Sequence, residues 1–323
     1  MVADGQSVDP LDCFLALDFG GTKLSAAVVS GEAGEWESQR RTESGTQAYE
    51  CLESILNLSH ELLKGRKPAA IGVSFGGPVI VETGHVVRSF QVAGWEDFPL
   101  QSKLQSEFKA PVIIDNDANA AALGEARFGA GRDCKNLFYI TVSTGIGGGW
   151  ILDGHLFRGA NDLAGEIGHL IVDPNGPRCG CGRYGCLETI ASGTGIARYA
   201  RERLTAESFI GNDLRELVNG DLSKITAEHV ARAAESGDGF SADVMDRAAA
   251  ALGKGIGTAI TLMNPQRVIV GGGVAKSGQK YWQSLRETVL HNVLPGMEMD
   301  VVPAALKDDS PLWGAIALAK GLI

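Results

Sequence analysis

The chain has 323 residues, of which 44% are apolar and 21% are charged. This length exceeds that of a typical domain, so we expect two domains or lobes. Because 39 Asp and Glu residues outnumber 29 Lys and Arg residues, the formal net charge is -10, which argues against binding to nucleic acid or to anionic lipid. The sequence has no apolar run of membrane-spanning length and no signal-peptide pattern at its N-terminus, so we expect a cytoplasmic protein.

Strand and helix patterns alternate along the chain. Residues 14–30 and 137–153 each predict a strand, a glycine-rich turn and a second strand, because apolar runs flank the turn. Residues 267–277 place three glycines directly after a strand. Helical periodicity is found at residues 47–64, 117–128, 194–204, 227–235, 244–262, 279–290 and 311–321. This alternation predicts an α/β fold.

No low-complexity segment marks a linker between two domains. We place the boundary near residues 115–135, between an apolar strand and the second predicted hairpin, and expect the last helix to return to the first lobe. The predicted division is an N-terminal tail at 1–13, a small lobe at 14–116 plus 311–323, and a large lobe at 117–310 that holds a cysteine cluster.

The first glycine-rich turn has the sequence Asp-Phe-Gly-Gly-Thr-Lys. Gly20 and Gly21 would let backbone N–H groups approach phosphate oxygens, while Thr22 and Lys23 would add a hydroxyl donor and a positive charge. Asp18, at the end of the strand, could hold the water shell of Mg²⁺. A hairpin that merely needs glycine for a tight turn is the alternative.

Two further glycine-rich turns follow predicted strands. Thr144 and Gly145 lie in the turn at 143–149 and would bring hydroxyl and N–H donors to a second phosphate. The triplet Gly271, Gly272 and Gly273 could let a flat base or a ribose lie against the backbone, although such a triplet is often only a turn. Together these turns suggest a nucleotide site.

Asn116 and Asp117 open the predicted helix at 117–128, directly after an apolar strand. One interpretation is an N-cap, because Asn and Asp are favoured there. The other is catalytic: a carboxylate at a helix start stays ionised and can accept the proton of a substrate hydroxyl. In phosphoryl transfer such a base mainly orients the nucleophile, so an aspartate with a low pKa is adequate.

Three of the six cysteines lie within eight residues, at Cys179, Cys181 and Cys186. With His169 they form a Cys₃His set that suits tetrahedral Zn²⁺ and leaves no open position for a catalytic water, so we expect a structural zinc site. Reduced thiols without metal are the alternative.

Two carboxylates lie next to these predicted metal ligands. Glu166 precedes His169 by three residues, and Glu188 follows Cys186 by two, so a bound metal would fix both carboxylates in space. Paired carboxylates suit the hydroxyls of a sugar, whereas most glutamates are simply solvated. Polar loops that could surround a small polar ligand contain Gly76, Gly77, Ser89 and Gln91.

Together these motifs resemble the ROK family of sugar kinases and sugar-responsive repressors, and specifically its glucokinase-like branch. The resemblance runs from about residue 14 to the C-terminus. It rests on the turn from Asp18 to Lys23, on the Asn-Asp-Ala-Asn helix start at 116–119, and on the Glu-x-Gly-His and cysteine motifs at 166–169 and 179–188.

The resemblance implies the actin-like ATPase fold, in which two ribonuclease-H-like α/β lobes close over ATP and sugar. It implies that Asp117 is the catalytic base. It also implies that the protein forms a homodimer. Sugar contacts are implied for Gly76, Gly77, Ser89, Asn116, Glu166, His169 and Glu188. Nucleotide contacts are implied for Gly20 to Lys23, Thr144, Gly145 and Gly271 to Gly273. The implied cofactors are ATP, Mg²⁺ and a structural Zn²⁺ on His169, Cys179, Cys181 and Cys186.

The expected reaction is transfer of the γ-phosphoryl group of MgATP to the 6-hydroxyl of glucose. The sequence departs from many members at Gly76-Gly77-Pro78, where they have Pro-Gly-Pro, and at Gln91, where they have Asn. The longer amide could select another sugar, so N-acetylmannosamine, N-acetylglucosamine and fructose are alternatives. A sugar-sensing repressor would need an added DNA-binding domain, for which the short segment before residue 14 leaves no room.

Overall fold

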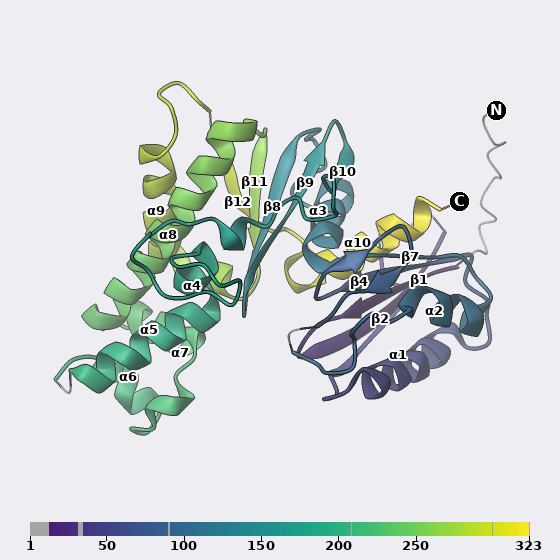
Figure 1. The fold of residues 1–323 in the computed structure, drawn as a ribbon, viewed down its shortest axis with the longest axis horizontal. Helices are drawn as coiled ribbons and strands as arrows, with labels where there is room; N and C mark the ends of the chain where they lie inside the picture. Colours follow the sequence, from purple (N-terminus) through teal and green to yellow (C-terminus); the bar gives the residue numbers. More distant parts are fainter. Residues whose placement is uncertain (1–12, 32–34, 90, 208, 299, 323) are drawn as a thin grey trace. The chain divides into compact units, whose positions relative to one another are not determined.

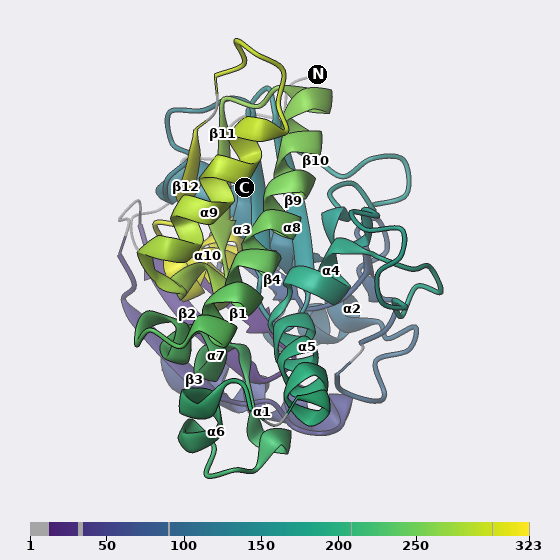
Figure 2. The ribbon, with the colours of Figure 1, turned by 90° about the vertical axis from the view of Figure 1, so that its left-hand side faces the viewer.

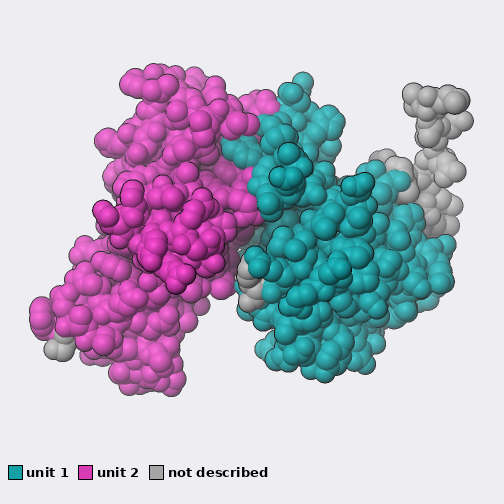
Figure 3. Space-filling view, viewed as in Figure 1, with its two compact units in different colours: residues 1–135, 149–164, 304–323 teal, residues 136–148, 165–303 magenta. Residues whose placement is uncertain are grey.

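The structure is a computed structural model that describes residues 13–31, 35–89, 91–207, 209–298 and 300–322 (Figure 1). Most of the expected N-terminal tail lies outside these ranges. The chain forms two compact units, which Figure 3 distinguishes by colour. Unit 1 comprises residues 1–135, 149–164 and 304–323, and unit 2 comprises residues 136–148 and 165–303.

Unit 1 contains a five-stranded sheet with the strand order β3-β2-β1-β4-β7. Its strands are β1 (Cys13–Phe19), β2 (Lys23–Ser30), β3 (Ser38–Glu43), β4 (Ala70–Phe75) and β7 (Val112–Asn116). The first three strands are antiparallel neighbours, whereas β4 runs parallel to both β1 and β7. The hairpin predicted at 14–30 is therefore confirmed as β1 and β2.

Alternate residues of this sheet face two different helical layers. One face packs on α1 (Ala48–Leu63) and α2 (Leu100–Phe108) through large apolar side chains such as Ile55 and Leu104. The other face packs on α10 (Ser310–Lys320), and a Cβ on Gly72 would lie 1.7 Å from the carbonyl oxygen of Ala315. Glycine at this position lets the helix approach the sheet backbone closely.

The helix α3 (Asp117–Phe128) packs closely on α10 in unit 1. A Cβ on Gly314 would lie 1.7 Å from the carbonyl oxygen of Ala120, so a larger residue would force the helices apart. The buried carboxylate of Glu125 accepts hydrogen bonds from Leu306 N at 2.9 Å and Ser310 Oγ at 2.7 Å. For these reasons α3 groups with unit 1, whereas the sequence placed residues 117–128 in the large lobe.

The second five-stranded sheet has the order β10-β9-β8-β11-β12. Its strands are β8 (Leu137–Val142), β9 (Ile146–Leu152), β10 (His155–Phe157), β11 (Arg267–Gly271) and β12 (Val301–Pro303). The last four residues of β9 and all of β10 group with unit 1. The hairpin predicted at 137–153 corresponds to β8 and β9.

The helices of unit 2 follow the cysteine-rich segment. They are α4 (Leu187–Ala191), α5 (Gly193–Ala206), α6 (Asn212–Leu217), α7 (Ala227–Glu235), α8 (Gly239–Met263) and α9 (Gly278–His291). Figure 2 shows α8 and α9 side by side. The predicted helices at 194–204, 227–235, 244–262 and 279–290 are confirmed, whereas α2, α4 and α6 were not predicted.

Short elements complete the described chain. They are the hairpin β5 (Val79–Ile80) with β6 (His85–Val86) and the 3₁₀ turns Ile167–His169, Leu222–Lys224, Val274–Lys276 and Lys307–Asp309. None of the helices built from the described residues has the length and apolar character needed to cross a membrane.

Candidate functional site

Polar side chains form a row across the ends of three neighbouring strands in unit 1. Asp18, Ser74 and Asp115 are register partners on β1, β4 and β7, so they share one face of the sheet. Ser74 Oγ donates a hydrogen bond to Asp18 Oδ1 at 2.7 Å. Burial raises the pKa of Asp18 to about 7; the Ser74 hydrogen bond opposes this rise, and the charge of Asp117 adds to it.

The first glycine-rich turn is closed by a hydrogen bond from Gly20 N to Lys23 O at 3.0 Å. Thr22 and Lys23 are exposed on it. A Cβ on Gly21 would lie 1.3 Å from Oε1 of Gln91, so the Gln91 side chain lies directly over this glycine. Two of the predicted loops therefore meet at Gly21.

The other loops predicted around a polar ligand are held by backbone contacts. Gly76 N donates to Phe19 O at 2.9 Å, which joins the Gly76-Gly77 loop to the start of the first turn. Ser89 Oγ accepts hydrogen bonds from the N–H groups of Gln91 and Val92, each at 3.2 Å. The structure thus brings all four predicted loop residues to the same end of the unit 1 sheet.

The N-terminus of α3 is capped by Asn116 and not by Asp117. Asn116 Oδ1 accepts hydrogen bonds from Ala118 N at 3.0 Å and Asn119 N at 3.4 Å, and its Nδ2 donates to Gly77 O at 3.2 Å. Asp117 is the first helical residue, is half-buried, and accepts Ala118 N through Oδ1 at 2.8 Å. The capping role therefore belongs to Asn116, which also ties the helix to the Gly76-Gly77 loop.

An ion pair between a buried carboxylate and a half-buried arginine adjoins this helix start and was missed from the sequence. Asp115 Oδ2 accepts Nε and Nη2 of Arg158, both at 2.7 Å. Burial raises the pKa of Asp115, and the charge of Arg158 opposes that rise. Asp115 adjoins the Asn-Asp motif, but nothing in the sequence points to Arg158, which lies 43 residues away.

In unit 2 the glycine turn after β8 supports one of the predicted sugar-binding carboxylates. Glu188 Oε2 accepts a hydrogen bond from Ile146 N at 3.0 Å. A Cβ on Gly145 would lie 2.5 Å from the same oxygen. Glycine at 145 therefore makes room for the carboxylate.

The glycine triplet after β11 lies against the end of β8. Gly272 has a φ of +88°, and a Cβ there would lie 2.3 Å from the carbonyl oxygen of Val142. Gly273 has open space at its Cβ position. The two turns predicted to bind nucleotide in this unit are thus neighbours, with Thr144 exposed on the first.

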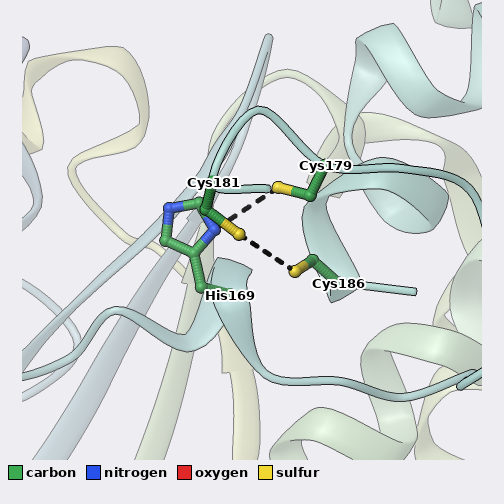
Figure 4. A group of neighbouring side chains, drawn as sticks. All are labelled: His169, Cys179, Cys181 and Cys186. Carbon is green, nitrogen blue, oxygen red and sulfur yellow. Dashed lines mark hydrogen bonds between the residues drawn. The ribbon is translucent and has the colours of Figure 1, made fainter. Parts of the chain in front are cut away.

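His169, Cys179, Cys181 and Cys186 converge in unit 2 (Figure 4). Their ligand atoms all lie within 4.8 Å of one another. The distance from Cys179 Sγ to His169 Nδ1 is 3.6 Å, and that from Cys181 Sγ to Cys186 Sγ is also 3.6 Å. Tetrahedral Zn²⁺ with bonds of about 2.0–2.3 Å requires edges of about 3.5–3.8 Å, so these two separations and the Cys₃His chemistry fit zinc.

The same histidine connects the cysteine cluster to the predicted sugar-binding residues. While its Nδ1 faces Cys179, its Nε2 lies 3.9 Å from Oε2 of Glu166. Partial burial raises the pKa of Glu166, His169 opposes the rise and the charge of Glu188 adds to it. Glu166, His169 and Glu188 therefore form one group beside the candidate metal site.

The predicted site residues are distributed over both units. Unit 1 holds Asp18, Gly20 to Lys23, Gly76, Gly77, Ser89, Gln91, Asn116 and Asp117. Unit 2 holds Thr144, Gly145, Glu166, His169, Cys179, Cys181, Cys186, Glu188 and Gly271 to Gly273. Within each unit they gather at strand ends and adjoining turns.

Comparison with known proteins identifies relatives over almost the whole chain. The chain is 38% identical over 325 residues to a glucokinase from Halalkalibacterium halodurans, covering 95% of this chain and 94% of the relative. It is 33% identical over 309 residues to an N-acetylmannosamine kinase from Escherichia fergusonii, covering 95% of this chain and 98% of the relative.

Solved structures agree with these relatives. The crystal structure of a ROK family glucokinase from Streptomyces griseus, in complex with glucose and AMPPNP, matches with a TM-score of 0.84 and 33% identity, covering 96% of this chain and 99% of that one. The predicted two-lobed α/β fold of the actin-like ATPases is therefore confirmed. The family model described as ROK matches residues 14–321, and the chain belongs to the ROK family.

Proposed function

We propose that the protein is a cytoplasmic glucokinase, which transfers the γ-phosphoryl group of MgATP to the 6-hydroxyl of glucose. The observation that carries this proposal is the placement of Asp117 as the first residue of α3, at the end of β7 and beside Asn116. The glucokinase relatives, which align over nearly the whole chain, support the choice of glucose.

Asp117 acts as the base in this proposal. The 6-hydroxyl gives its proton to the Asp117 carboxylate while its oxygen bonds to the γ-phosphorus, and the bond to the bridging oxygen breaks to leave ADP. Because the transition state is loose, the main task of Asp117 is to orient the hydroxyl. The dipole of the helix stabilises a negative charge at this position.

Backbone N–H groups and Lys23 stabilise the phosphates. The turn from Gly20 to Lys23 is assigned to the transferred end of the nucleotide, together with Thr144 and Gly145. Asp18 would hold water bound to the Mg²⁺ of MgATP, and loss of its proton is then favoured by the cation. The remaining part of the nucleotide would lie along Gly271, Gly272 and Gly273.

In this proposal Asn116, Glu166, His169 and Glu188 contact the sugar hydroxyls, together with the loop residues Gly76, Gly77 and Ser89. Zn²⁺, held by His169 Nδ1, Cys179, Cys181 and Cys186, would supply a structural anchor and no reactive group. With Nδ1 so engaged, His169 presents Nε2 to the sugar, and the pair of carboxylates rejects sugars that lack a matching hydroxyl.

An N-acetylmannosamine kinase is the alternative, because a relative with that name is 33% identical. Gln91, whose side chain lies over Gly21, is the residue expected to distinguish the two substrates. The test is ADP release with MgATP, compared as kcat/KM for glucose, mannose, fructose, N-acetylglucosamine and N-acetylmannosamine. Preference for glucose supports the proposal, whereas preference for an acetamido sugar or no turnover with any of the five contradicts it.

A further inference from the structure

The carboxylate of Asp115 is fully buried and is hydrogen-bonded on both oxygens. Oδ2 accepts Nε and Nη2 of Arg158, each at 2.7 Å. Oδ1 accepts the N–H of Asn116 at 2.8 Å and the side-chain Nδ2 of Asn119 at 2.9 Å. One carboxylate therefore joins the loop after β10 to the backbone and first turn of α3.

These contacts bracket Asp117 on both sides along the chain. Asn116, immediately before it, is held through its N–H, and Asn119, two residues after it, is held through its side chain. Asn116 Oδ1 also caps the N–H groups of Ala118 and Asn119. Asp115 therefore holds the chain on both sides of Asp117 and so sets the orientation of Asp117 at the start of α3.

Asp115 can serve all four donors only as an anion, because a protonated carboxyl would bring its own hydrogen to one of them. Burial without a cation would favour the protonated form. Arg158 supplies the positive charge, and its planar fork places two N–H groups on one oxygen.

The loop that carries Arg158 is itself constrained. Arg158 O accepts a hydrogen bond from Ala164 N at 2.9 Å, and Gly159 between them has a φ of +76°. The Arg158 side chain as a whole is 27% exposed, so small solutes can reach its position from solvent.

We propose that Arg158 is a positioning residue for phosphoryl transfer, which acts through Asp115 to fix the orientation of Asn116 and Asp117. This inference rests on the proposed function of Asp117 as base. It differs from a purely structural role, because a displaced base lowers kcat even in protein that remains folded. A displacement of about 1 Å can cost about 100-fold in rate.

The test compares Arg158→Ala with Arg66→Ala. Arg66 is a matched control in the same unit, because it also donates two hydrogen bonds to one carboxylate, that of Glu37, but at an exposed position. We expect Arg158→Ala to lower kcat by about 10- to 100-fold with the KM for ATP within about twofold of the original, and Arg66→Ala to leave both unchanged.

Chemical rescue separates positioning from folding. Millimolar guanidinium should restore part of the kcat of Arg158→Ala by occupying the position of the lost side chain, whereas the same concentration of urea should not. A kcat of Arg158→Ala within twofold of the original protein would overturn the inference, as would a loss that guanidinium and urea affect equally.

A second variant covers the case in which Arg158→Ala does not fold. Arg158→Lys keeps the charge but replaces the fork with a single ammonium, so we expect a folded protein with kcat lowered several-fold. If Arg158→Lys folds with unchanged kcat while Arg158→Ala does not fold, the role is structural and the inference fails.

Amide hydrogen exchange tests this inference independently of the proposed function. In Arg158→Ala, or in Arg158→Lys if the alanine variant is unfolded, the amides of Asn116, Ala118 and Asn119 should exchange faster. If the unaltered protein phosphorylates no hexose, the proposed function is wrong, but faster exchange still supports control of the helix start by Arg158. Unchanged exchange at all three amides would contradict it.

Discussion

Glu188 Oε2 accepts a hydrogen bond from the backbone N–H of Ile146 at 3.0 Å. The carboxylate assigned to the sugar is thereby fixed to the glycine turn assigned to the phosphates. A shift of this turn must move Glu188 as well, so the groups proposed to bind sugar and phosphate in unit 2 are mechanically linked.

Replacing Gly145 should disturb sugar recognition through this link. A Cβ at 145 would lie 2.5 Å from Glu188 Oε2, so Gly145→Ala must displace the carboxylate from Ile146 N. Loss of a hydrogen bond to a charged group costs about 1.5–3 kcal/mol, which corresponds to a fall of about 10- to 100-fold in kcat/KM for glucose. Steady-state kinetics, with the glucose concentration varied at saturating ATP, measure this fall in kcat/KM.

Gly239→Ala is the control for this substitution. Gly239 lies at the start of α8, and the space around its Cβ position is open within 4 Å. Its kinetics should match those of the original protein. Equal kcat/KM values for Gly145→Ala and Gly239→Ala would show that Glu188 is not positioned by this turn.

The raised pKa of Asp18 predicts a specific dependence of stability on pH. Folded Asp18 keeps its proton up to about pH 7, whereas the unfolded group loses it near 3.8, so the folded state binds more protons between these values. The free energy of unfolding contributed by Asp18 therefore falls as pH rises through this window, by up to about 1.4 kcal/mol for each pH unit.

Urea unfolding at pH 5 and pH 8, without nucleotide or Mg²⁺, measures this contribution. Asp18→Asn removes the titrating group, so the original protein should lose more stability than the variant between the two pH values. Parallel losses in both proteins would mean that Asp18 does not titrate in this range.

The cysteine cluster predicts one bound zinc per chain. Cys179→Ser should lower the zinc content and, because His169 would lose its anchor, weaken glucose binding as well as thermal stability. Elemental analysis and glucose titration check both effects. Cys134→Ser, which alters a cysteine outside the cluster, should retain both zinc and glucose binding. Purified original protein with almost no zinc would refute this prediction.

The sequence predicted those features that are encoded locally. Apolar runs on either side of glycine predicted the β1–β2 and β8–β9 hairpins, and periodicity predicted α3 and α8. The spacing of His169 and three cysteines indicated a donor set whose atoms do lie together. In each case the residues that allow the prediction lie close together in the sequence.

Contacts between distant residues were not predictable in this way. Arg158 meets Asp115 only because β7 and the loop after β10 are brought together by the fold, and neither segment shows this on its own. Gln91 lies over Gly21 for the same reason. The capping role of Asn116 was also hidden, because Asn and Asp stand side by side and both favour helix starts.

The most direct test of the proposed kinase is a comparison of Asp117→Asn with the original protein. Asparagine keeps the shape of the side chain and an oxygen that can accept the N–H of Ala118, so the helix start should persist. We expect kcat for glucose to fall by about 100- to 10,000-fold, with the Kd for glucose changed only a few-fold. Turnover that equals that of the original protein would contradict the assignment of Asp117 as the base.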